Sequence, residues 1–394
     1  MTTLEKRASA TLALLFFLRM YSLFMVLPVL SIAAEQFKNN TALLTGLALG
    51  IYGLTQALMQ IPFGIWSDRF GRKPVILFGL VLFLLGSIIA AFADSIYWLI
   101  LGRSLQGAGA IAAAVMALAA DLSREEHRTK VMAFIGMSIG MAFSLAFVTG
   151  PIIFDALSLK GLFLLSALFA VLAMLVLLGL VPSTTQKVER ERYAHDKLTD
   201  VLKHGDLMRL NLSIFCSHFI LMANFVVLPI VLEQIIQLDT LKHWQFYLPL
   251  LLVSVALMVP MVLLADKDNG FKKRVFLFAI ILFVCGQFFM GLMFESFLGL
   301  FVAGVLFFAA FNFLEAFLPA RVSSIAADDN RGTALGVYST IQFLGIFLGG
   351  LIGGYCYGEW GIQAVFMVCG AISIIWWLIV SGINLSSEEK VLAG

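Results

Sequence analysis

Twelve apolar segments, each about as long as a bilayer core is thick, follow one another along this chain. A helix needs about 20 apolar residues to cross that core. Of the 394 residues, 61% are hydrophobic and 13% are charged, and the mean hydropathy is +0.99. A soluble core does not bury so much apolar surface. We therefore predict an all-α membrane protein with twelve transmembrane helices at 10–34, 43–66, 74–93, 96–120, 130–153, 160–181, 208–234, 244–265, 273–293, 296–319, 332–356 and 361–383.

The basic residues predict how the chain crosses the membrane. The first segment lacks a small-residue cleavage site, so we expect a retained span rather than a signal peptide. With both termini inside, 21 of the 26 Lys and Arg residues fall on the cytoplasmic side, and only Lys38, Lys160 and Lys242 fall outside. The positive-inside rule then predicts cytoplasmic termini. The net charge of +2 follows from this topology, and a nucleic-acid-binding face is not supported.

The sequence also repeats itself. Phe24-Met-Val-Leu-Pro-Val-Leu30 in the first span is echoed 201 residues later by Phe225-Val-Val-Leu-Pro-Ile-Val231 in the seventh. A weaker echo, at a spacing of 203 residues, places Gly150 opposite Gly353. Such repeats usually enclose a substrate path at their interface, near the midplane of the membrane. We predict an N-terminal six-helix half, a charged cytoplasmic loop and a C-terminal six-helix half at 1–181, 182–207 and 208–394.

A short charged loop separates the second span from the third. It reads Gly64-Ile-Trp-Ser-Asp-Arg-Phe-Gly-Arg-Lys73, and Pro74 follows at a position suited to opening the next helix. Gly64 is expected to permit close approach of helices, and Gly71 to permit a tight turn. One acid and three cations in so short a loop predict a hinge that is held by ion pairs at the membrane surface.

This pattern resembles the signature of the major facilitator superfamily of transporters. The resemblance implies a conformational latch, closed in the outward-facing state and broken in the inward-facing one. Asp68 would meet the start of the eleventh span, where the helix dipole favours an anion, and Arg72 would pair with Asp121. Alternatively, the charges only anchor the loop among lipid headgroups. The corresponding loop at 266–273 is degenerate and one residue longer, so a weaker latch is expected there. The predicted latch residues are Gly64, Asp68, Arg69, Gly71, Arg72, Lys73 and Asp121.

The fourth span carries a second pattern of the same superfamily, Leu99-x-x-x-Arg-x-x-Gln-Gly-x-Gly-Ala110. Arg103 and Gln106 are three residues apart and so share one helix face. An Arg inside the membrane costs at least about 2.5–3.5 kcal/mol on insertion scales, so Arg103 should face the bundle interior. The resemblance implies a role in proton coupling. The alternative is a buried hydrogen-bonding hub that fixes helix packing.

Gly150-Pro151 in the fifth span resembles a third pattern, which is associated with drug:proton antiporters. The Gly-Gly pair expected after it is replaced by Phe154-Asp155, a departure that bears on the direction of transport more than on the fold. Helix packing alone is the alternative role for these glycines. The predicted packing residues are Gly107, Gly109, Gly150, Pro151, Gly349 and Gly353.

Other polar residues inside the spans are candidates for coupling and for substrate contact. Glu315 is the most isolated acid of the spans and the leading candidate for a proton carrier, with a structural partner of an arginine or a helix end as the alternative. Histidines ordinarily titrate near neutral pH, which makes His218 a further candidate, with a satisfied core histidine as the alternative. The predicted proton-coupling residues are Arg103, Glu315, Arg19 and His218. The predicted substrate cavity is lined by Tyr52, Gln56, Gln60, Gln106, Asn224, Asn312 and Gln342.

Patterns of enzymes and of ATP-driven pumps are missing from the sequence. The four cysteines lie within spans, and no pair has metal-ligand spacing. We find no catalytic triad, metal cluster or Walker A sequence. We therefore predict that the chain is not an enzyme, that it binds no metal or cofactor, and that a proton gradient is its energy source. We also expect a monomer.

Together these patterns predict a secondary active transporter of the drug:proton antiporter type. Its partners would be protons, the lipid bilayer and a small lipophilic or amphipathic substrate that it exports. The loop and the segment Asn312–Glu315 are most similar to the bacterial YajR-like subgroup, which implies the inner membrane; we expect this chain to lack the small soluble C-terminal domain known there. The alternatives are a symporter or facilitator for a nutrient or metabolite, and a membrane sensor or scaffold that no longer transports.

Overall fold

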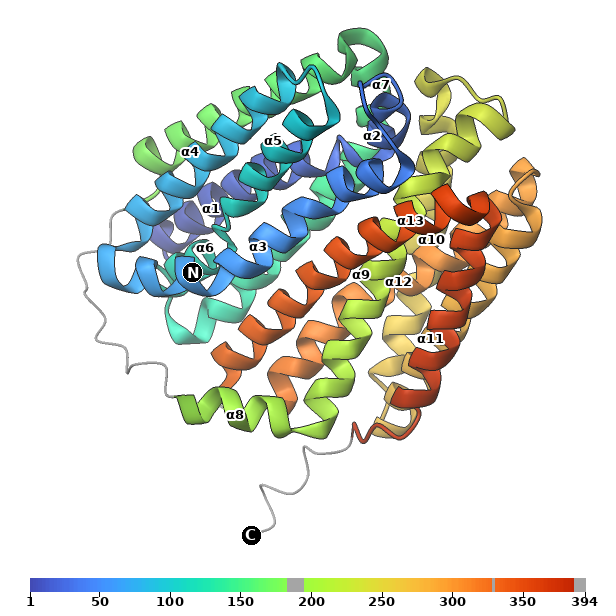
Figure 1. Ribbon diagram of the computed structural model, residues 1–394. Coiled ribbons are helices and arrows are strands. Elements are labelled where there is room, and N and C mark those ends of the chain that lie inside the picture. The colour runs from blue at the N-terminus through green and yellow to red at the C-terminus, as the bar shows by residue number, and fades with distance from the viewer. Residues whose placement is uncertain (183–194, 328–329, 386–394) are drawn as a thin grey trace. The chain divides into compact units, whose positions relative to one another are not determined.

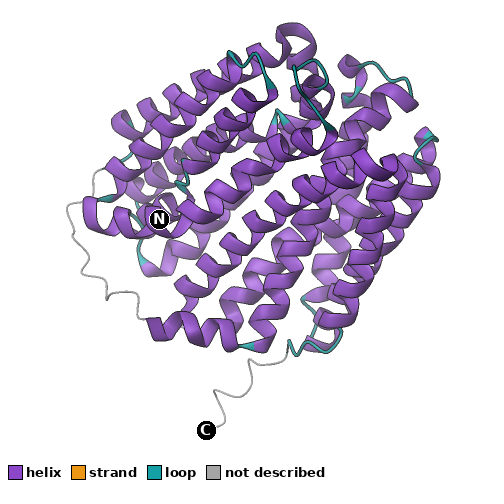
Figure 2. Ribbon diagram, in the orientation of Figure 1, coloured by secondary structure: helices purple, strands orange, loops and turns teal. Residues whose placement is uncertain are grey.

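The chain is helical in nearly all of the residues that the computed structural model describes, which are 1–182, 195–327 and 330–385 (Figures 1 and 2). Within these residues no β-strand forms, and one isolated bridge joins Lys38 to Ser95. The predicted all-α fold is confirmed. Some of the basic residues that predicted the orientation lie outside the described residues, namely Lys187, Arg190, Arg192 and Lys390.

Two compact units make up the described structure. The first unit contains the residues up to 182, and within it α1 packs along α7, α3 along α5, and α4 along both α5 and α7 (Figure 1). Its helices are α1 (Thr3–Phe24), α2 (Leu27–Ala34), α3 (Ala42–Phe70), α4 (Arg72–Ala91), α5 (Ile96–Ala108), α6 (Ala112–Asp121) and α7 (Glu125–Gly179).

The second unit repeats this arrangement. In it α9 packs along α13, as α1 does along α7, and α11 packs along α12 and α13, as α4 does along α5 and α7. Its helices are α8 (His195–Lys203), α9 (Gly205–Ile230), the π-helical turn η1 (Val231–Ile235), α10 (Trp244–Ala265), α11 (Asn269–Met293), α12 (Phe297–Ile325) and α13 (Arg331–Val380).

The boundaries differ in two places from the predicted halves. Residues 183–194 of the predicted central loop lie outside the described residues, and the loop's remainder forms α8 and the start of α9. The segment Asp239–Trp244, predicted within the C-terminal half, belongs to the first unit. It includes the short 3₁₀ helix η2 (Thr240–Lys242), which packs against α7. This contact is made in space and leaves no mark in the local sequence.

Ten helices of the described chain are long and apolar enough to cross a membrane. Two of them contain one residue each with non-helical backbone angles: Ser158 in α7 (φ 59°, ψ 179°) and Gly361 in α13 (φ 82°, ψ −178°). Each break separates two span-length pieces, which yields the twelve spans that the sequence predicted. The two breaks are 203 residues apart, the same spacing that relates Gly150 to Gly353. The duplication is therefore present in the backbone as well as in the sequence.

Prolines mark where the first and seventh spans depart from a regular helix. The ring of a proline removes a backbone donor and clashes with the preceding turn. The first span breaks between α1 and α2, and Pro28 stands in the first turn of α2, where its missing N–H is tolerated. In the seventh span α9 runs through Pro229 and passes directly into the π-helical turn η1. The same residue thus stands at the start of a helix in the first repeat and just before a π-helical turn in the second.

Most of the predicted packing glycines lie where two helices approach closely. A Cβ at Gly107 would collide with the backbone of Tyr52 in α3, and one at Gly349 with the backbone of Phe219 in α9. Gly150, in α7 before Pro151, lies against the carbonyl of Met25. Small residues at such crossings let backbones approach and let helices pack without a hydrophobic driving force. The remaining two, Gly109 and Gly353, meet the carbonyl of Gly79 and the backbone of Ala223.

Candidate functional site

Residues 64–73, predicted as a loop, are almost entirely helical: α3 continues to Phe70, Gly71 makes the turn and α4 begins at Arg72. Gly71 sits there with a φ of 94°, in the left-handed region that favours glycine, so the tight turn predicted for it is present. Gly64 behaves differently from the prediction: an added Cβ would meet its nearest neighbour, the Cβ of Ala113, at 3.9 Å, an ordinary van der Waals distance. The expectation that Gly64 is needed for close helix approach was therefore wrong, because the facing residue is itself small.

Arg72 is the centre of this turn. Its side chain is 8% exposed. Its guanidinium donates to Asp121 Oδ2 at 3.0 Å and to Ser67 Oγ at 2.7 Å, and it forms an ion pair with Asp68. The predicted pair of Arg72 with Asp121 is thus present, and it ties α4 to the end of α6. The predicted contact of Asp68 with the start of the eleventh span, and the latch itself, stay predictions.

The other two cations of this segment make contacts of their own. Lys73 donates to the carbonyl of Val181 at 2.7 Å, which ties α4 to the end of the sixth span. The Arg69 guanidinium lies over the ring of Phe70, 5.3 Å from its centroid. A cation over an exposed ring adds about 0.5–1 kcal/mol at most. The loop therefore contains one buried ionic hub and two peripheral cations.

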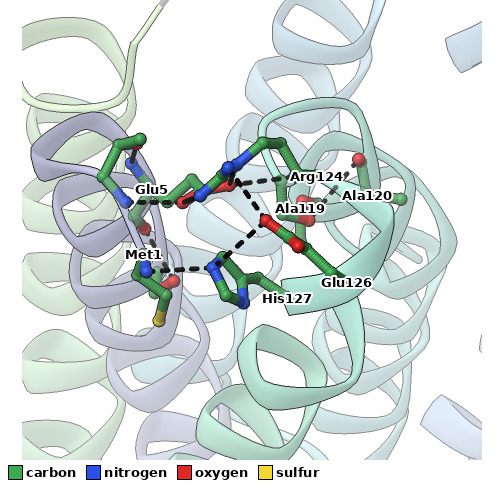
Figure 3. A network of polar contacts seen from close by, with 10 residues as sticks. Met1, Glu5, Ala119, Ala120, Arg124, Glu126 and His127 are labelled. Carbon is green, nitrogen blue, oxygen red and sulfur yellow. Dashed lines mark hydrogen bonds and ion pairs between the residues drawn. The ribbon is translucent and has the colours of Figure 1, made fainter.

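A second ionic network holds the same end of the first unit (Figure 3). The carboxylate of Glu5, which is 4% exposed, accepts from Arg124 Nε at 3.0 Å and from the Arg124 backbone N–H at 3.1 Å. It also completes a capping box with Thr2 at the start of α1. The hydrogen bond to Glu5 raises the pKa of Arg124 above its ordinary value.

Further contacts in Figure 3 join Glu126 to Arg124 at 2.8 Å and His127 Nε2 to the terminal amine of Met1 at 3.0 Å. Asp121 and Arg124 lie on the two sides of the short turn between α6 and α7. The two ionic networks therefore fix both ends of this turn. The sequence reasoning missed the role of Glu5. The capping-box spacing from Thr2 to Glu5 was a signal for the helix start, but nothing local indicated a partner 119 residues away.

A polar cluster lies in the interior of the first unit, among α1, α3, α4 and α5. Arg103, fully buried, donates to Gln106 Oε1 at 2.8 Å and to the carbonyl of Ala48 at 3.3 Å. Gln106 in turn donates to Ser87 Oγ at 2.9 Å. The guanidinium of Arg103 lies over the ring of Tyr52, 4.6 Å from its centroid. The hydrogen-bonding hub expected for Arg103 is therefore present.

Arg19 enters the same cluster from α1 and is 1% exposed. Its Nη2 atom donates to the carbonyl of Gly109 at 2.8 Å and to Gln56 Oε1 at 3.4 Å. Its guanidinium carbon lies 5.8 Å from the ring centroid of Phe83. Two predicted coupling residues and three predicted cavity residues, Tyr52, Gln56 and Gln106, thus meet in one place. Gln60 is 6% exposed and lies one helical turn beyond Gln56.

A different polar cluster lies in the interior of the second unit. His218 Nε2 is 3.6 Å from Glu315 Oε1 and 2.9 Å from Gln342 Nε2. His218 Nδ1 lies 3.2 Å from the carbonyl of Ile214. A proton on Nδ1 satisfies that carbonyl and leaves Nε2 as an acceptor for Gln342, which is the tautomer that the contacts favour. The structure therefore brings together Glu315, His218 and Gln342, which the sequence could only list separately.

Two further predicted cavity residues, Asn312 and Asn224, belong to helices of the second unit. Asn312, three residues before Glu315 on α12, donates to Ser254 Oγ of α10 at 3.2 Å. Asn224 is 2% exposed, and both of its amide atoms lack a hydrogen-bond partner within the described residues. Over the whole of the described chain, no group of three or more His, Cys, Asp or Glu side chains is suited to hold a metal ion. Substrate contact by these residues stays a prediction.

Comparisons with known proteins agree with this architecture. Residues 12–265 and 210–390 match the Major Facilitator Superfamily. The chain is 44% identical over 383 residues to the inner membrane transport protein YajR of Escherichia coli K12, covering 97% of this chain and 84% of the relative. It is 30% identical over 158 residues to the class H tetracycline resistance protein of Pasteurella multocida, covering 37% of this chain and 40% of the relative. The solved structure of a bacterial homologue of the human lysosomal transporter Spinster superimposes with a TM-score of 0.77, at 15% identity and 96% coverage of both chains.

Proposed function

Since this chain belongs to the major facilitator superfamily, and is thus a multi-pass inner-membrane transporter rather than an enzyme, we propose that it exports a small lipophilic or amphipathic compound in exchange for protons. Transport of this kind proceeds by alternating access of a central site to the two sides of the membrane. Protonation of a buried group shifts the balance between the two states, because the proton binds one state better than the other. Both termini would lie in the cytoplasm.

The observation that carries the proton coupling is the contact of Glu315 with His218. Glu315 Oε1 is buried and has no hydrogen-bond partner within the described chain, although 37% of the side chain as a whole is exposed, and His218 Nε2 lies 3.6 Å away. An acid in such a place either takes up a proton itself or shares one with the imidazole. Acid and histidine chains inside membranes serve as proton relays in pumps and transporters. We assign Glu315 as the proton carrier and His218 as the group that exchanges the proton with it.

Arg103 and Arg19 take an indirect part in this proposal. A guanidinium does not release its proton in proteins, so neither residue carries protons itself. Their fixed charges bias the energies of the conformational states instead. The Arg72 cluster and the Glu5–Arg124 pair hold one end of the first unit rigid, as a latch requires, and the latch residues act on the rate and balance of the exchange rather than on the proton.

The direction of transport has two candidates. Similarity to a tetracycline resistance protein over part of the chain supports export. The replacement of the expected Gly-Gly by Phe154-Asp155 favours the second candidate, a proton symporter or facilitator for a nutrient or metabolite. Gly150 lies against the carbonyl of Met25, a packing contact that fits either direction of transport, so the similarity to an export protein makes antiport the better supported candidate.

Proteoliposomes with an acidic interior and a trapped pH-sensitive dye test the proposal. Tetracycline and benzoate, added outside in turn, are the probes. We expect at least one probe to alkalinise the interior of vesicles that hold the wild-type protein, relative to empty vesicles. Glu315→Gln should abolish this response because the amide cannot carry a proton. Glu295→Gln, which changes an exposed acid between α11 and α12, is the matched control and should retain it.

Two outcomes would contradict the proposal. Acidification of a neutral interior on addition of either probe, driven by an acidic exterior and exceeding that of empty vesicles, would establish symport in place of antiport. A Glu315→Gln protein that exchanges protons at the wild-type rate would remove Glu315 as the carrier.

A further inference from the structure

The interior of the first unit contains hydrogen-bond donors that have no acceptor. The buried atoms Nε and Nη1 of Arg19, Nη2 of Arg103 and Nε2 of Gln56 lack a hydrogen-bond partner within the described residues. All of these are donors, and their side chains are at most 1% exposed. Gln60 Oε1 is the one unpartnered acceptor on the same stretch of α3. Buried polar groups in folded proteins are almost always paired, so this surplus of donors calls for an acceptor that the chain does not supply.

The two guanidinium groups contact the same two spans, the second and the fourth. Arg103 stacks on Tyr52 and binds Gln106, while Arg19 binds Gln56 and the carbonyl of Gly109. Tyr52 and Gln56 are four residues apart on α3, and Gln106 and Gly109 are three apart along the fourth span. The contacts of the two arginines therefore follow one another along the same faces of α3 and of the fourth span, at steps of about one helical turn.

This pair of cations is not neutralised by the protein. Among the described residues, no carboxylate forms an ion pair with Arg19 or Arg103. Both residues keep their charge because a guanidinium is not deprotonated in proteins. The rings of Tyr52 and Phe83 take up the faces of the two guanidinium groups, which is a partial compensation and leaves the N–H groups at the edges unsatisfied. An uncompensated buried charge is strongly destabilising, and two neighbouring like charges are more so.

We propose that Arg19 and Arg103, with Gln56, form an anion-binding site that holds the carboxylate of the transported compound. A carboxylate has two oxygens in one plane and accepts pairs of parallel N–H bonds from guanidinium edges. The rings of Tyr52 and Phe83 beside it suit an apolar body attached to that carboxylate. The substrate class is therefore an amphipathic organic anion. The statement that this anion is transported rests on the proposed function; the statement that it binds does not.

The site is closed in this structure. Since the guanidinium groups are at most 1% exposed, an anion reaches them when the helices that cover them move apart, as they do in one phase of alternating access. A substrate that neutralises the cluster stabilises whichever state encloses it, and this differential affinity is what a substrate needs to drive the change of state.

Thermal unfolding of the full-length protein in detergent, at constant ionic strength, tests the site without knowledge of the natural substrate. The probes are benzoate, its neutral isostere benzamide, its cationic isostere benzamidinium and the related anion phenylphosphonate. Binding to the folded state alone raises Tm with ligand concentration. We expect benzoate to give a saturable rise of about 2 °C or more, and benzamide and benzamidinium to give none.

Variants then place the effect on the two arginines. Arg19→Gln and Arg103→Gln should each raise the half-maximal benzoate concentration by at least about tenfold, because each removes a charged donor. Arg19→Lys and Arg103→Lys keep the charge but lose the paired N–H geometry, and serve if a glutamine variant fails to fold. Glu295→Gln, which changes the exposed acid between α11 and α12, should leave benzoate binding unchanged. A protein that binds benzoate through the arginines but shows no proton exchange would overturn the proposed coupling and leave the anion site standing.

Three results would overturn the site. The first is a wild-type Tm that benzoate does not raise, and the second is an equal rise with benzamide. The third is a benzoate response that survives in all of the arginine variants. A response to phenylphosphonate in the absence of one to benzoate would overturn the assignment to carboxylates.

Discussion

The two units bring equivalent helices together at equivalent residues, yet their interiors carry different chemistry. Gly86 of α4 lies against the carbonyl of Gly102, and Gly286 of α11, 200 residues further on, lies against the carbonyl of Ala303, 201 residues after Gly102. The crossing of α4 with α5 is thus repeated in the crossing of α11 with α12. At those crossings the contacts are made by backbone and small residues, so the frame does not depend on which polar side chains point into each interior.

The cations of the first unit have no counterparts in the second. The residue 201 positions after Arg103 is Gly304, and the open space at its Cα is filled by Leu250. The residue 201 positions after Arg19 is Ile220, which is fully buried. Where the first unit has two guanidinium groups, the second has aliphatic packing.

The titratable pair of the second unit is likewise unmatched in the first. Positions 201 residues before Glu315 and His218 hold Ala114 and Phe17. The comparison teaches that duplication preserved the packing and that each half acquired its own polar cluster: fixed charges in the first and exchangeable protons in the second. This division fits a transporter in which one half holds an anionic substrate and the other holds the proton, as proposed above.

The turns between α3 and α4 and between α10 and α11 are expected to differ most in how much their cations contribute to the stability of the fold. The first is organised by the buried guanidinium of Arg72, whereas in the second Asp268 caps α11 by accepting from the backbone N–H of Phe271 at 2.9 Å. Arg72→Ala leaves Asp121 and Asp68 without their common cation, and we expect it to lower the free energy of unfolding by about 3 kcal/mol. Denaturant or thermal unfolding in detergent measures this loss.

The control for that prediction is Lys273→Ala in the turn of the second unit, which we expect to stay within about 0.5 kcal/mol of the wild type. Equal losses in the two variants would mean that the turns are equally dependent on their cations, and the contrast between them would be lost.

The contact of α3 with α5 is closer than that of α10 with α12. In the first unit Gly107 meets the backbone of Tyr52 directly, while in the second unit α10 reaches α12 through long side chains such as Phe246, whose ring centroid is 5.8 Å from that of Phe297. Gly107→Ala should therefore cost about 2 kcal/mol, since the backbone of α3 has to move. Unfolding measurements compare it with Gly136→Ala, a site on α7 with open space around it.

At Gly136 we expect a gain of about 0.5–1 kcal/mol, because alanine is the better helix former and nothing obstructs its methyl group. If Gly107→Ala were as well tolerated as Gly136→Ala, the close approach of α3 and α5 would not be a constraint on the first unit.

The position in the first unit that is equivalent to His218 holds Phe17. Replacing His218 by Phe therefore tests the difference between the two interiors with a small expected effect on stability. His218→Phe keeps an aromatic ring at the site but removes the hydrogen bond with Gln342, so we expect it to lower the free energy of unfolding by about 1 kcal/mol. The rate of proton exchange against pH should then follow one titration step, that of Glu315, in place of two. Met222→Leu, one turn further along α9, is the control for repacking. An unchanged pH profile in His218→Phe would exclude His218 from the exchange.

Much of this architecture was predictable because it depends on residues that are close together in the sequence. The span lengths, the glycine turn at Gly71 and the spacing of the repeats depend on neighbouring residues and on the thickness of the bilayer. The pairing of Arg72 with Asp121 was also predictable, though only through resemblance to a known family. The expectation for Gly64 was wrong because a glycine in the sequence does not reveal that the facing residue, Ala113, is small as well.

What the sequence determined by itself is the frame: a helical membrane protein of duplicated halves, with polar residues that the lipid forces inward. What the tertiary structure decided is which of those residues meet. Glu315 and His218 are 97 positions apart, and Arg19 and Arg103 are 84 apart. A helix dictates neighbours three or four residues away and no further, so the partners of a buried charge depend on how several helices pack. That packing alone placed a titratable pair in one unit and an uncompensated pair of cations in the other.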